Sequence, residues 1–140
     1  MYGFHIELDL PFGEATSAVT DALKAEGFGV LSDIDIQGAM KQKLDVDMPA
    51  YRILGACNPP LAHKALQAEP EIGLLLPCNV VVREKVGGGV VVGFLDPQTM
   101  VRLTGNDQVR AVADDAGERL RRTRERLKAE HGGRDEGAPA

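Results

Sequence analysis

Two Cys-Asn pairs are the residues of this chain best suited to chemistry, and they contain all of its cysteines. Cys57 and Asn58 lie in LGACNPPLAHKAL, just before Pro59, and Cys78 and Asn79 lie in LLLPCNVVV. A thiolate is a nucleophile and a metal ligand, and an Asn side chain both donates and accepts hydrogen bonds. The repeated setting predicts one shared site, provided that the two segments lie on adjacent strands.

The residues after Cys57 are typical of a helix start. Asn58 can cap the helix, and Pro59 suits its first position because that position needs no amide donor. The amides and partial positive charge of a helix start favour a nearby anion, so Cys57 is expected to ionise more readily than a free thiol. The alternative is that Cys57 is only a small buried apolar side chain, the commoner fate of free cysteine.

The second pair favours packing more strongly. Cys78 lies in an apolar run predicted to be a strand, where burial raises the pKa of a thiol. Asn79 is unusual in a strand. If it points inward it needs partners, so we expect it to bond either the irregular backbone around Pro77 or a ligand.

Other motifs give weaker signals. The two thiols and His63 lack any recognised zinc spacing, no Cys-x-x-Cys occurs, and no metal ligand is predicted. The run VGGGVVV lacks the Lys-Ser or Lys-Thr of a phosphate loop and predicts a hairpin. The run ERLRRTRERLK belongs to a helix with acidic residues one turn before its arginines, which is typical of a solvated face.

Composition narrows the class of protein. A chain of 140 residues, 44% hydrophobic and 26% charged, is typical of one soluble domain with one core. The net charge of -5 and the absence of tryptophan argue against nucleic acid and anionic membranes as partners. We find neither a signal segment nor an apolar run long enough to span a bilayer. The expected location is the cytoplasm, where two cysteines are usually free thiols.

Hydrophobic periodicity predicts alternating strands and helices. Asp35 is expected to cap a short helix that buries Ile36, Ala39, Met40 and Leu44. Pro77 is expected to mark an edge, a bulge or a local break in its strand. Strands are predicted over 1–10, 28–36, 51–57, 72–84 and 90–96, and helices over 13–26, 36–44, 59–69, 97–105 and 107–127.

This order predicts an α/β (α+β) fold, a two-layer sandwich in which helices cover a mixed β-sheet. The sheet is expected to finish in a β-hairpin, and a long helix to follow it. Residues 1–131 are predicted to form a single domain. Residues 132–140 are polar and glycine-containing, and are predicted to be a disordered tail.

The stretch YRILGACNPPLAHKAL followed by EPEIGLLLPCNVVVRE resembles the uncharacterised bacterial and archaeal family numbered 302 among the domains of unknown function. The likeness extends over nearly the whole chain up to the long final helix. It implies a two-layer α/β fold that tends to form homodimers, without an agreed activity. The residues it transfers are Cys57, Asn58, Pro59, Cys78 and Asn79, as a motif of unsettled role.

Two functional hypotheses follow from these observations. The first is a homodimeric module that binds a small ligand near the paired Cys-Asn motifs. The second is thiol chemistry, in which Cys57 reacts with a peroxide or an electrophile and Cys78 resolves the product, or a weak metal site. Dimerisation is expected because LLLPCNVVV and GGGVVVGFL have more apolar length than one layer of helices covers.

Overall fold

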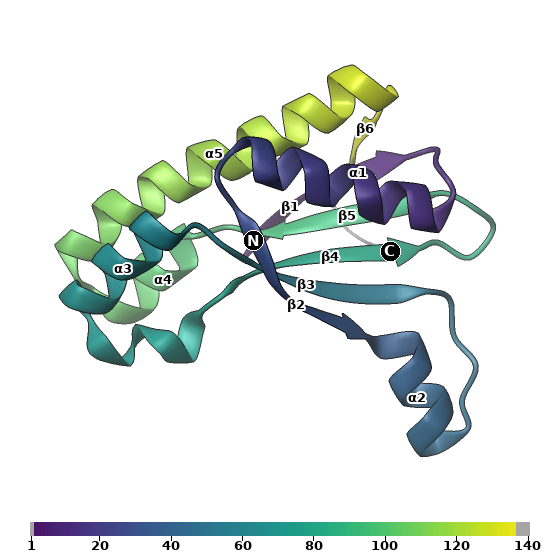
Figure 1. Ribbon diagram of the computed structural model, residues 1–140, viewed down its shortest axis with the longest axis horizontal. Coiled ribbons are helices and arrows are strands. Elements are labelled where there is room, and N and C mark those ends of the chain that lie inside the picture. Colours follow the sequence, from purple (N-terminus) through teal and green to yellow (C-terminus); the bar gives the residue numbers. More distant parts are fainter. Residues whose placement is uncertain (1, 137–140) are drawn as a thin grey trace.

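The computed structural model describes residues 2–136, whose strands form one six-stranded sheet (Figure 1). The sheet order is β2-β3-β4-β5-β1-β6. Along the chain the elements are β1 (Gly3–Leu8), α1 (Phe12–Ala25), β2 (Gly29–Asp35), α2 (Ile36–Leu44), β3 (Tyr51–Cys57), α3 (Pro59–Ala68), the 3-10 helix η1 (Pro70–Leu75), β4 (Cys78–Glu84), β5 (Val90–Leu95), α4 (Gln98–Thr104), α5 (Asp107–His131) and β6 (Arg134–Glu136). The predicted α/β fold, with its hairpin and long final helix, is confirmed.

The prediction of a mixed sheet is wrong, because every pair of neighbouring strands is antiparallel. The helices α2 and α3 lie at the ends of the sheet and return the chain beside the strand it has just left. Two connections cross the sheet. The helix α1 joins β1 to β2, which are separated by β5, β4 and β3, and α4 with α5 joins β5 to β6, which are separated by β1. A parallel neighbour requires a crossover between adjacent strands, and this chain makes none.

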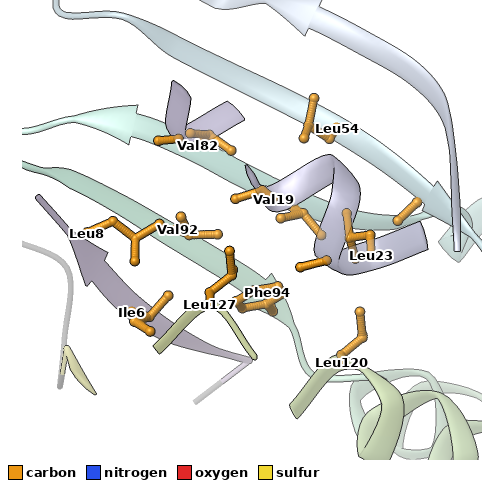
Figure 2. Packing of buried hydrophobic residues seen from close by; sticks show 14 of the residues in the cluster. Ile6, Leu8, Val19, Leu23, Leu54, Val82, Val92, Phe94, Leu120 and Leu127 are labelled. Carbon is orange, nitrogen blue, oxygen red and sulfur yellow. The ribbon is translucent and has the colours of Figure 1, made fainter. Parts of the chain in front are cut away.

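The main core lies between the sheet and the helices α1 and α5 (Figure 2). Strand residues alternate between two faces, so Phe4, Ile6 and Leu8 of β1 point toward the helices while His5 points away. The rings of Phe4 and Phe94 stack with their centroids 5.2 Å apart. Leu23 of α1 joins this core, and the other fully buried large side chains include Val19, Leu54, Val80, Val82, Val92, Leu120 and Leu127.

A second apolar cluster lies past the end of the sheet. The amino-terminal half of α5 extends beyond the strands and packs with α3, α4 and η1 (Figure 1). Its buried members are Leu61, Ala65, Ile72, Cys78, Met100, Val101, Val109, Val112, Ala113 and Ala116. The helix α5 is therefore long because it serves both clusters.

The prediction that α2 buries an apolar face is wrong. Its residues Ile36, Ala39, Met40 and Leu44 are all at least partly exposed, and none is buried. Figure 1 shows the reason, since α2 stands apart from the other helices, beyond the end of β2. The expected cap is confirmed, because Oδ1 of Asp35 accepts a hydrogen bond from the amide of Gly38 at 3.0 Å.

The predicted strand over 72–84 is shorter than expected. Residues 70–75 form the 3-10 helix η1, and β4 starts only at Cys78. Pro77 lies just before the strand, after a cis Leu76-Pro77 peptide bond. Because proline has no amide to donate to the ladder, the local break predicted there is confirmed.

Within the segment predicted to be a disordered tail, Arg134–Glu136 form the short strand β6. The strand β6 pairs with β1, and Nη1 of Arg134 lies 2.7 Å from Oδ2 of Asp9. The hydrogen bond and charge of Arg134 hold the pKa of Asp9 below its ordinary value. Gly133 is buried, and a Cβ there would lie 2.6 Å from Cδ1 of Ile6, so glycine lets the tail approach the core. The rest of the predicted tail, residues 137–140, lies outside the described residues.

No helix between residues 2 and 136 has the length and apolar character needed to cross a bilayer.

Candidate functional site

The two Cys-Asn segments meet because β3 and β4 are neighbours. Ala56 pairs with Cys78, and Gly55 pairs with Asn79, in an antiparallel register. The end of β3 and the start of β4 therefore lie side by side at one end of the sheet. A pocket of about 280 Å³ opens there, and its lining includes Cys57, Asn58 and Cys78.

The remaining walls of this pocket, which we call the Cys57–Cys78 pocket, are almost wholly apolar. They come from both core clusters, with Phe28 and Ala56 on the sheet side and Met100 on the helix side. The other lining residues are Leu31, Leu61, Ala62, Ala65, Leu66, Gly73, Leu76, Pro77, Val112 and Ala116. Ligand pockets in proteins run from about 300 to 1,000 Å³, so this one suits a small ligand.

The side chain of Asn58 links the start of α3 to the residue after α1 by hydrogen bonds. Its Oδ1 accepts a hydrogen bond from the amide of Leu61 at 3.3 Å, which confirms the predicted cap of α3. Its Nδ2 donates to the carbonyl oxygen of Glu26 at 3.5 Å, just after α1. Pro59 lies at the first position of α3, as predicted, but is exposed and outside the pocket lining.

The two thiols differ in their surroundings. Both are free cysteines, Cys78 buried and Cys57 partly exposed. Burial raises the pKa of Cys78 from its ordinary 9.0 to about 11, and the nearby Cys57 adds to the rise. Cys78 is therefore protonated at neutral pH, and Cys57 is the more accessible of the pair.

Asn79 lies on the other face of the sheet. Its neighbours Cys78 and Val80 point toward the helices, so strand alternation turns Asn79 away from them, and it is exposed. There it lines a larger hollow of about 830 Å³. The structure thus brings together Cys57, Asn58 and Cys78, while Asn79 belongs to the opposite side of β4.

A metal site has little geometric support. Among residues 2–136, no group of three or more His, Cys, Asp or Glu side chains could hold a metal ion. His63 is exposed on α3 and is not part of the pocket lining. Among the described residues, the pocket lining therefore offers a metal ion two thiols, Cys57 and Cys78, and no third ligand of these types.

The hollow on the opposite face contains residues that the sequence did not single out. Tyr51, Arg83 and His5 line it together with Asn79. A signal was present, because period-two alternation places Asn79 and Arg83 on one side of their strand. What the sequence lacked was the order of the strands and the knowledge that helices leave this face open.

Comparisons with known proteins identify the fold and the family without an activity. A protein of Aquifex aeolicus (strain VF5) described as uncharacterized is 28% identical over 93 residues, which cover 66% of this chain and 58% of the relative. The crystal structure of an uncharacterized conserved protein DUF302 from Bacillus stearothermophilus has a TM-score of 0.82 to this chain, with 27% identity, and covers 90% of this chain and 98% of that one. The family model described as "Domain of unknown function DUF302" matches residues 4–127, so the chain belongs to this family.

Proposed function

We propose that this protein binds a small, largely apolar ligand in the Cys57–Cys78 pocket. The observation that carries this proposal is the convergence of two separate Cys-Asn segments on one pocket between the two core clusters. Protein interiors are close-packed, and an open apolar space leaves its lining without contacts. A ligand supplies those contacts, and the two thiols give it a polar point of recognition.

The rim of the pocket supports the same proposal. Leu31 and Leu66 both line the pocket, yet their exposed fractions are 72% and 42%. Apolar side chains beside an apolar pocket extend the surface that a ligand can remove from water. The ligand we expect therefore has an apolar body and few charged groups.

The test is a thermal-shift screen of metabolites with a pocket-filling variant. Ala62 is partly buried in the lining, so Ala62→Phe is expected to fill the pocket from its mouth. Ala111→Phe, at an exposed position of α5, is the matched control. We expect apolar compounds that raise the melting temperature of the wild type and of Ala111→Phe but not of Ala62→Phe. A screen without stabilising compounds, or equal stabilisation of all three proteins, would contradict the proposal.

Thiol chemistry at the same pocket is the second candidate, favoured by the presence of both cysteines in one lining. In this alternative Cys57 reacts with a peroxide or an electrophile and Cys78 resolves the product. Free thiols persist in a reducing compartment, so we keep the cytoplasm as the expected location. If Cys57 resists alkylation in the folded protein, this alternative fails, and the pocket is a binding site alone.

We also infer a homodimer, but from a different surface than the sequence suggested. Val80, Val82, Val90 and Val92, from the apolar runs that predicted it, are buried within the chain itself. Exposed apolar side chains gather instead on β2, α2 and the residues that follow, which we call the β2–α2 arm. They are Leu31, Ile34, Leu44 and Val46.

The arm has the features of a self-complementary interface. The strand β2 is the outermost strand of the sheet, so one of its edges has no neighbour among residues 2–136. A free strand edge beside exposed apolar residues is a template for pairing with a second copy about a two-fold axis. Such pairing would also bury the apolar side chains of α2, which are at least partly exposed within residues 2–136.

Light scattering at micromolar concentration tests this dimer. We expect twice the chain mass of 15.0 kDa for the wild type. The double variant Ile34→Lys and Leu44→Lys is expected to have the mass of a single chain, because burying its two lysine charges in an interface is unfavourable. Leu74→Lys is the control, because Leu74 is 82% exposed but lies outside the arm. A wild-type mass of one chain would refute the homodimer, and a double variant that stays dimeric would refute the arm as its interface.

A further inference from the structure

We infer that the hollow of about 830 Å³ on the open face of the sheet is a second binding site, for a small ligand that carries an oxyanion group held by Arg83. This site is separate from the Cys57–Cys78 pocket, because it lies on the opposite side of β3 and β4. Its residues come from the strands β1, β3, β4 and β5 and from the loops at 48–50 and 85–86. The inference does not depend on the apolar ligand proposed above.

The register of the strands places Tyr51 and Arg83 side by side, with Asn79 farther along the same face. Tyr51 of β3 pairs directly with Arg83 of β4, so their side chains are neighbours on the same face. Asn79 lies on that face too, since it is four positions before Arg83 along β4 and side chains alternate between the faces. All three line the hollow. They supply a guanidinium, a hydroxyl and an amide.

The floor of the hollow is formed in part by Gly93 of β5 and the His5 ring beside it. Gly93 pairs with His5 on one side and with Val81 on the other. A Cβ at position 93 would lie 3.0 Å from Cδ2 of His5, so the imidazole ring occupies the space above the glycine. Two loops raise the walls, one through Pro49 and one through Val86. The result is a concave surface rather than the flat face of an ordinary sheet.

The charges around the hollow leave Arg83 available. Lys85 pairs with Glu7 at 3.1 Å. Glu84 accepts a hydrogen bond from the amide of Ala50 at 3.3 Å. Arg83, in contrast, makes neither an ion pair nor a side-chain hydrogen bond within residues 2–136. The side chains of Tyr51 and Asn79 also make no hydrogen bond within these residues. In a chain with a net charge of -5, an arginine that is partly buried and has no carboxylate partner is notable.

The chemistry of these groups identifies the ligand class. The planar guanidinium presents parallel N–H donors that match the oxygens of a carboxylate or a phosphate. The hydroxyl of Tyr51 adds a donor beside it. The amide of Asn79, about 13 Å farther along β4, offers a polar contact to another part of the ligand. Val81, Val91 and Leu95 line the same hollow and provide apolar surface for the rest of the ligand. The expected ligand is therefore a small molecule with one oxyanion group and an apolar or planar body.

The test is a titration of the full chain, labelled with nitrogen-15, followed by amide chemical shifts at constant ionic strength. Benzoate and phenyl phosphate are the probes, which separate carboxylates from phosphates, and benzyl alcohol is the uncharged control. We expect at least one anionic probe to shift the amides of Tyr51, Asn79 and Arg83 while benzyl alcohol does not. Arg83→Gln is expected to weaken that binding about tenfold or more, because a charge-assisted pair is lost.

Matched variants make the result decisive. Arg102→Gln removes an exposed arginine of α4 outside the hollow and is expected to bind like the wild type. Arg83→Lys keeps the charge without the planar fork and is expected to bind with intermediate affinity. Unshifted amides with both anionic probes would overturn the inference, and so would equal binding by Arg83→Gln, whose spectrum also reports its folding. A single-chain mass for Arg83→Gln, where the wild type is a dimer, would also overturn it, since the face would then be an interface between copies.

Discussion

Replacing Leu120 with alanine is expected to lower the free energy of unfolding by about 3–5 kcal/mol. Leu120 is 0% exposed and belongs to the cluster in which α5 packs on the sheet (Figure 2). The loss combines the transfer energy of the removed atoms with a cavity, because two layers of regular structure cannot collapse fully around a missing side chain. Urea denaturation followed by circular dichroism measures it, as a lower midpoint at an unchanged slope.

Leu103→Ala is the control for this experiment. Leu103 lies on α4 and is 66% exposed, so its truncation is expected to change the stability by less than about 0.5 kcal/mol. If both variants lost a similar amount of unfolding free energy, burial of Leu120 between α5 and the sheet would not explain the loss. A small loss in both would mean that the helix layer is replaceable.

The parts of the fold that could be predicted from the sequence depend on neighbours along the chain. The alternation in GFHIEL is a local signal and correctly predicts β1. Asn58 followed by Pro59 correctly predicts the start of α3, because a cap and a fixed φ act within one turn. The glycines of KVGGG correctly predict a hairpin, and all three have positive φ.

The parts that could not be predicted depend on segments far apart in the chain. Nothing in the sequence near β1 shows that it pairs with β5 and β6 rather than with β2. The strand β6 has three residues, too few for a periodic pattern, and its hold on β1 rests on ion pairs of Arg134 with Asp9 and Glu7. The helix α2 has an apolar pattern and contacts β3, yet none of its residues is buried, so the pattern predicted burial that residues 2–136 do not supply.

The candidate site divides in the same way. The cap at Asn58 is local and was predicted, whereas the meeting of Cys57 with Cys78 required β3 and β4 to be adjacent. The face on which Asn79 lies could have been predicted from alternation alone, since Cys78 and Val80 on either side of it belong to the apolar core. Its relevance to a second site could not, because that depends on a face that the helices leave open.

Raising the pH from 8 to 11 is expected to remove about 2 kcal/mol of stability that the buried thiol of Cys78 provides. The pKa of this thiol is raised by burial from 9.0 to about 11. Between these values the unfolded chain has already lost the proton while the folded chain still binds it. Stability therefore falls as the pH rises through this window, and the contribution is fully present below pH 9.

Cys78→Ala isolates this contribution, because lysines and tyrosines titrate equally in the wild type and the variant. We expect the stability difference between the two proteins, measured by urea denaturation, to shrink by about 2 kcal/mol from pH 8 to pH 11. A difference that stays constant would show that the thiol is not desolvated in the folded protein. The pKa of Cys78 would then be close to its ordinary value of 9.0, and Cys78 could serve as the resolving thiol that the thiol hypothesis needs. A shrinking difference instead leaves Cys57 as the only thiol able to react at neutral pH, which favours a pocket that binds over one that cycles between two thiols.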